Sequence, residues 1–102
     1  MNAFVMKADG FAHIEAAPKA SLVYTYSWTD WMNKCGITAI TTALITPDPG
    51  LTLTGGYVIS GGLVAQRFTL GSLLRPYKAV CRATFNTGES DERTVVFDVR
   101  PR

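Results

Sequence analysis

The feature that most constrains this chain is an alternation of apolar and polar residues with a period of two. It begins at Leu22 and runs to Trp28, and it returns in Tyr77–Phe85 and in Arg93–Arg100. A period of two places successive side chains on opposite faces of an extended backbone, which is the pattern of a half-buried β-strand. The chain is therefore expected to fold mainly into β-strands.

Turn residues divide the chain into short segments. The sequence Pro47-Asp48-Pro49-Gly50 ends Ile37–Thr46, where the apolar spacing fits helix or strand but the threonine content favours a strand. Gly55-Gly56 breaks or bulges the next strand, and Gly61-Gly62 predicts a tight hairpin turn. We predict a second hairpin loop at residues 86–90.

These segments predict an all-β fold, an antiparallel immunoglobulin-like β-sandwich of about six or seven strands, with no convincing helix. Residues 30–34 are expected to form a turn. The inward faces of the strands predict the core, whose expected members are Tyr24, Tyr26, Trp28, Cys81, Ala83, Phe85, Val95, Phe97 and Val99. Cys35 and Cys81 match no zinc or redox spacing and are expected to be free thiols.

Residues 1–19 show no clear period and are expected to form an N-terminal arm, with the sandwich domain spanning 20–102. The arm is expected to be extended, with a short strand at Phe4–Lys7. Its apolar residues are too many for a solvated tail, so we expect a partner to order them. They are Phe4, Val5, Met6, Phe11 and Ile14.

The composition and the polar residues exclude several classes of function. A net charge of +2 is too small to predict nucleic-acid binding, and no apolar stretch is long enough to span a membrane. His13 is the one histidine and has no set of partners for catalysis or metal binding. Asp91 and Glu92 are adjacent and would point to opposite faces of a strand. We therefore predict no enzyme activity, no cofactor and no metal.

The middle and end of the chain resemble the phage fibre–tail adaptor proteins, small immunoglobulin-like proteins of tailed phages. The resemblance covers residues 18–102, and its most specific part is Asp91-Glu92-Arg93 followed by alternating apolar residues. The other matching segments are the aromatic strand and Trp turn at 24–31, the Thr/Ile strand at 37–46, Pro49–Thr52 with the glycine-rich hairpin, and the Tyr-led strand at 77–85. The chain departs from the family pattern at Cys35-Gly36 and at Leu73-Leu74-Arg75.

The resemblance implies a structural protein of the virion that joins the phage tail to fibres or spikes. We expect identical copies to form a ring, assembled in the host cytoplasm, with the tail tube or adaptor and a fibre or spike as partners. The alternative is a capsid decoration protein or a carbohydrate- or protein-binding module. Besides the apolar residues of the arm, the expected interface residues are Trp31, Leu73, Leu74 and Arg75. Trp31 either caps the core or anchors a partner.

Overall fold

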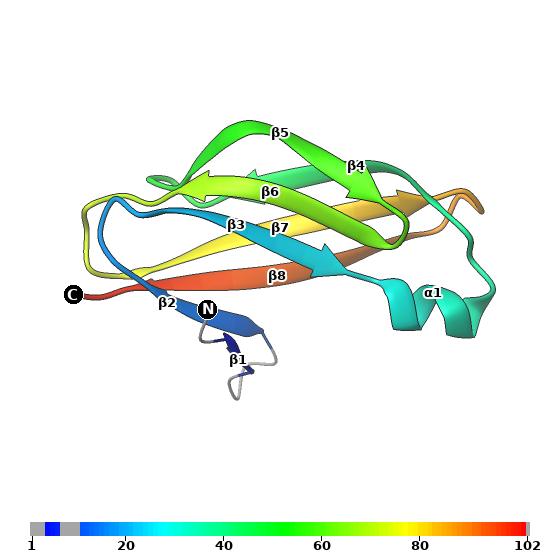
Figure 1. Cartoon of the computed structure of the whole chain (residues 1–102), viewed down its shortest axis with the longest axis horizontal. Coiled ribbons are helices and arrows are strands. Elements are labelled where there is room, and N and C mark those ends of the chain that lie inside the picture. Colours follow the sequence, from blue (N-terminus) through cyan, green and yellow to red (C-terminus); the bar gives the residue numbers. More distant parts are fainter. Residues whose placement is uncertain (1–3, 7–10, 102) are drawn as a thin grey trace.

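The computed structural model describes residues 4–6 and 11–101, and Figure 1 shows two β-sheets packed face to face with a short helix at one end. The five-stranded sheet has the order β1-β2-β8-β7-β4, and the three-stranded sheet has the order β3-β6-β5. The elements are β1 (Phe4–Met6), β2 (Ala12–Ala16), β3 (Ser21–Ser27), α1 (Thr29–Cys35), β4 (Ile40–Pro47), β5 (Thr52–Ser60), β6 (Leu63–Thr69), β7 (Pro76–Phe85) and β8 (Ser90–Val99).

The prediction of a mostly β fold in two sheets is confirmed, including strand β4 in the ambiguous segment and both hairpins. Ser60 pairs with Leu63 around Gly61-Gly62, and the register of β5 shifts between Thr54 and Val58 as the glycine pair predicts. The described residues contain eight strands rather than six or seven. One pair is also not antiparallel, because β2 runs parallel to β8. After β2 the chain crosses to the other sheet and does not fold back as a hairpin.

The core lies between the two sheets and is built from their inward-facing residues. Eight of the nine predicted core residues are buried, and Tyr24 is half-buried with its ring 4.8 Å from that of Tyr26. The Tyr26 hydroxyl donates a hydrogen bond across the core to the carbonyl oxygen of Ala79, at 2.9 Å. This contact is possible because small side chains on β7 leave space for the aromatic rings of β3.

The prediction of a turn after Trp28 is wrong, because residues Thr29–Cys35 form helix α1. Asp30 lies in its first turn and Lys34 in its last turn, and both charges favour the helix dipole. Gly36 ends the helix with a φ of 70°, and its N–H donates to the carbonyl oxygen of Met32. At seven residues the helix is too short to show a helical period in the sequence.

Residues 12–16 of the predicted N-terminal arm are ordered within the sandwich itself. They form β2, which pairs with β8 from Ala12 opposite Val95 to Ala16 opposite Val99. Its alternate residues Ala12, Ile14 and Ala16 belong to the core. The short strand predicted at Phe4–Lys7 is present as β1, and Lys7 lies outside the described residues.

Both cysteines are free, as predicted, but their surroundings differ. Cys35 is exposed at the end of α1, whereas Cys81 is fully buried on β7. Burial raises the pKa of the Cys81 thiol to about 12, because the thiolate would lose its hydration.

We therefore expect an aromatic disulfide reagent at pH 8 to modify Cys35 of the folded chain rapidly. Cys81 should react only after unfolding, because the thiolate is the reacting form and burial disfavours it. The measurement is absorbance of the released thiol with and without denaturant. In the Cys35→Ser variant the rapid phase should disappear. Rapid reaction of both thiols in the folded wild-type protein would show that Cys81 is accessible.

Candidate interaction surface

Two unpaired strand edges lie on the same side of the sandwich. Within the part of the chain that the structure describes, β4 is the last strand of the five-stranded sheet and pairs only with β7, while β5 is the last strand of the other sheet and pairs only with β6. Figure 1 shows β4 and β5 next to each other along the upper side of the molecule. We call these two strands and their outer edges the β4–β5 side.

The β4–β5 side carries almost no charge. From Gly36 to Gln66 the sequence has a single charged residue, Asp48, which lies in the turn between the two strands. The Asp48 carboxylate accepts a hydrogen bond from the backbone N–H of Lys78 at 2.8 Å. Soluble proteins usually protect exposed strand edges with charged side chains, which prevent pairing with other chains. That protection is missing from β4 and β5.

Both strands expose large apolar side chains, which point away from the core on the two opposite outer faces of the sandwich. Leu44 on β4 is 64% exposed, and Val58 on β5 is 63% exposed. Both stand on the outer faces of their sheets, because the residues beside them, Ile45 and Ile59, point toward the core. Tyr57 is 41% exposed in the bulge of β5. The sequence analysis missed this surface, although the uncharged run 36–66 was the signal for it.

The shape of the β5 edge is fixed from inside by Gln66. This side chain is buried, and its Nε2 donates to the carbonyl oxygens of Thr54 at 3.3 Å and Gly55 at 3.0 Å. It also donates to the carbonyl oxygen of Arg67 at 2.8 Å. Gly55 has a φ of 74°, which a residue with a side chain rarely adopts. The bulge is therefore held by its own core and presents a defined edge.

The predicted interface residues of the β6–β7 loop are exposed. Leu73 is 62% and Leu74 is 58% exposed. Arg75 supports the loop, because its Nη2 donates to the carbonyl oxygen of Pro49 at 2.9 Å and its guanidinium lies 4.9 Å from the Tyr77 ring centre. The leucines are thus presented by an anchored loop.

The other predicted interface residues lie elsewhere and do not form one site. Ile14 is in the core at 3% exposure, so a partner cannot reach it. Trp31 packs half-buried with its ring 5.1 Å from that of Phe85, which matches the alternative that it caps the core. Phe11 is half-buried, with the Lys78 ammonium 5.6 Å from its ring centre. Phe4–Met6 form β1, the outer strand of the sheet opposite β4.

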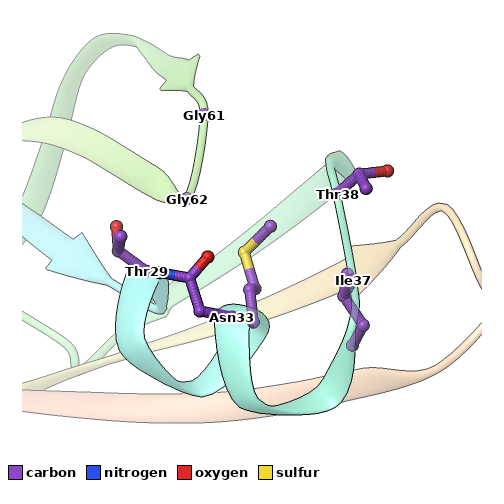
Figure 2. Close-up of a pocket in the computed structure, with 7 residues that line it drawn as sticks. Thr29, Asn33, Ile37, Thr38, Gly61 and Gly62 are labelled. Carbon is purple, nitrogen blue, oxygen red and sulfur yellow. The ribbon is translucent and has the colours of Figure 1, made fainter.

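A pocket of about 310 Å³ lies between α1 and the β5–β6 hairpin, and Figure 2 shows its lining residues. Its apolar members Met32 and Ile37 are buried, and Thr29, Asn33 and Thr38 are exposed polar residues around them. On the hairpin side the lining consists of Gly61 and Gly62. The pocket has no titratable side chain among these residues, so it can accept a side chain but offers no group for acid–base chemistry.

The polar residues weighed for chemistry make structural contacts. His13 Nδ1 lies 2.8 Å from Asp98 Oδ2 on β8. Asp91 accepts a hydrogen bond from Trp28 Nε1 at 2.9 Å. Glu92 pairs with Arg82 on β7 at 3.3 Å, so the two adjacent acids point to opposite faces as predicted.

Among residues 4–6 and 11–101, no three His, Cys, Asp or Glu side chains gather in a group that could hold a metal ion. Within the same residues, no helix is long and apolar enough to cross a membrane.

Comparison with known proteins gives one family. The family model described as "Podophage GP4 fiber-tail adaptor protein gp77" matches residues 17–98. No curated protein sequence matches the chain significantly. The matched residues run from the turn before β3 almost to the end of β8 and include the whole β4–β5 side and the β6–β7 loop. Because the match covers most of the chain, the protein belongs to the podophage GP4 fiber-tail adaptor family, gp77.

Proposed function

We propose that this protein is a non-enzymatic connector of the virion, which joins the phage tail to fibres or spikes as a ring of identical copies. Membership of the fiber-tail adaptor family supports a structural role in the tail and contact with other tail or fibre proteins. Such a connector works by geometry, since repeated copies present the same weak contact many times. Assembly takes place in the host cytoplasm before the virion is released.

The observation that carries this proposal is the β4–β5 side. This side has two unpaired strand edges and three exposed apolar side chains, and neither strand carries a charged residue. Such edges are suited to contact with another protein. A partner strand can add to either edge through backbone hydrogen bonds. Leu44 adds an apolar contact beside the β4 edge, and Val58 adds one beside the β5 edge on the opposite face of the sandwich. We assign this side to a fibre, spike or tail protein. The outer edge of β1 offers a second site for strand addition at the opposite end of the same sheet.

We also infer that the sandwich is of the immunoglobulin-like type. The order β3-β6-β5 in one sheet and β4-β7-β8 in the other corresponds to the B-E-D and C-F-G strands of that fold. Tyr77 lies near the start of β7, and its hydroxyl donates to the carbonyl oxygen of Leu73 at 3.4 Å, in the manner of a tyrosine corner. This fold is known for presenting edges and loops to partners, which agrees with an adaptor.

Incorporation into particles tests the proposal. In the double variant Leu44→Asp/Val58→Asp, a partner that docks on either edge would have to bury a new carboxylate beside it, which costs several kcal/mol. We expect incorporation into assembled tails to fall on the order of a hundredfold or more, since each 1.4 kcal/mol is a factor of about ten. The variant should keep the melting temperature of the wild type, because both positions are exposed.

The control is Val23→Asp, which places one carboxylate on an exposed valine of β3, at the other edge of the small sheet, and each of the single variants Leu44→Asp and Val58→Asp is compared with it. This control should enter particles normally. A folded double variant that enters particles as well as the wild type would overturn the assignment of the β4–β5 side.

A further inference from the structure

The two ends of the long axis differ in their connecting segments. The domain measures 43 Å along this axis, with the β6–β7 loop at one end and α1 at the other (Figure 1). At the first end, which we call the Leu73 end, Lys19 N donates to Gly71 O and Val99 N donates to Arg75 O, so these segments lie together. At the second, the α1 end, Trp28 N donates to Gly62 O and Asn86 N donates to Ala39 O.

The two ends carry opposite charge. Among the described residues, the loops and the C-terminal segment at the Leu73 end contain three basic residues and one acidic residue, namely Lys19, Arg75, Arg100 and Asp48. The connecting segments of the α1 end contain two acidic residues and one basic residue, namely Asp30, Glu89 and Lys34. Opposite charges at the two ends favour contact of one copy's Leu73 end with another copy's α1 end, and they disfavour contact between two identical ends.

The two ends also complement each other in shape. The Leu73 end projects two exposed leucines from an anchored loop. The α1 end holds the pocket of about 310 Å³ with buried Met32 and Ile37 among its lining residues. A leucine side chain is small enough to enter such a volume, and the open space at Gly61 allows the backbone of a second chain to approach.

We infer that Leu73 and Leu74 of one copy dock at the α1 end of a second copy. This inference rests on the ring assembly proposed above and assigns its interface. The contact is heterologous, because it joins two different surfaces of identical chains, and such contacts close into rings when the rotation between copies allows it. Arg75 beside the leucines then faces the acidic residues of the next copy, Asp30 and Glu89. The β4–β5 side stays free for other virion proteins.

The contact is small, which determines how it must be measured. The end of the molecule spans 29 × 23 Å, so one contact buries less than the roughly 800 Å² per partner of a standard stable interface. A single contact is therefore weak, and a closed ring gains stability from its many copies. Self-association should depend on concentration and should weaken at high salt.

Complementation between two variants tests this interface. Leu73→Asp/Leu74→Asp removes the leucines, and Asn33→Arg places a long basic side chain at the mouth of the pocket, where it repels Arg75. The measurement is sedimentation velocity at protein concentrations up to about 1 mM, where a contact with a binding free energy of about 4 kcal/mol becomes detectable. The wild type should form oligomers, and each variant alone should stay monomeric. An equimolar mixture should form a one-to-one dimer, since it restores one intact pair of surfaces.

The control separates this inference from the proposed function. Leu44→Asp/Val58→Asp should self-associate like the wild type even when it fails to enter particles, because the β4–β5 side lies outside both ends. The interface is wrong if the wild type stays monomeric at 1 mM, if either variant assembles like the wild type, or if the mixture remains monomeric. Melting temperatures of all variants near the wild-type value exclude unfolding as the cause.

Discussion

Replacing Phe97 by alanine is expected to lower the free energy of unfolding by about 3–5 kcal/mol. The Phe97 side chain is fully buried on β8, with its ring 5.1 Å from that of Phe68 in the facing sheet. It also lies between Ile14 on β2 and Tyr77 on β7 in the register of its own sheet. Truncation removes contacts with both sheets and leaves a cavity that rigid strands cannot fill.

Urea denaturation followed by intrinsic fluorescence measures this loss. Small domains have total stabilities of about 5–15 kcal/mol, so the change removes a large share. Leu44→Ala is the matched control, because this exposed side chain should change stability by less than about 0.5 kcal/mol. A loss below about 1 kcal/mol for Phe97→Ala would mean that the inward face of β8 is assigned wrongly.

Deleting residues 2–17 is expected to prevent folding at 37 °C or to lower stability by more than any single core truncation. The deletion removes β2, which buries Ala12, Ile14 and Ala16 and covers the edge of β8. The backbone groups of β8 that pair with β2 would face water, and its apolar neighbours would lose their cover. Circular dichroism during a thermal melt measures the result.

Two point variants on β2 make the deletion interpretable. Ile14→Ala should cost about 2–4 kcal/mol, because the side chain is buried, whereas exposed Glu15→Ala should be nearly neutral. A truncated chain with the melting temperature of the full chain would show that residues 2–17 are an arm after all.

The strands that the sequence predicted well are those with one buried and one solvated face. On β7 the buried residues Tyr77, Ala79, Cys81, Ala83 and Phe85 recur every second position, so local pattern and tertiary burial agree. The same holds for Val95, Phe97 and Val99 on β8. Val96 breaks the pattern because it is buried as well, on the other face of the sheet.

The features missed from the sequence depend on contacts between distant segments. Strand β2 is short, and its buried positions 12 and 16 are alanines, whose small apolar surface gives little periodic signal. Its parallel pairing with β8 joins residues more than 80 positions apart, which no local pattern reports. The β4–β5 side was missed for a related reason, since only the sheet order shows that these two strands are edges on the same side.

The most direct measurement of the central claim is amide hydrogen exchange of the protein, free and in assembled tails. In the free chain, β4 pairs with β7 and β5 pairs with β6, so every second backbone N–H of each edge strand points outward, away from that neighbouring strand. These outward amides should exchange rapidly. In the particle we expect them to exchange on the order of tenfold or more slowly, because a docked strand pairs with them. Amides of β4 and β5 that exchange equally fast in both states, with protection only elsewhere, would contradict the claim that this side joins the adaptor to the virion.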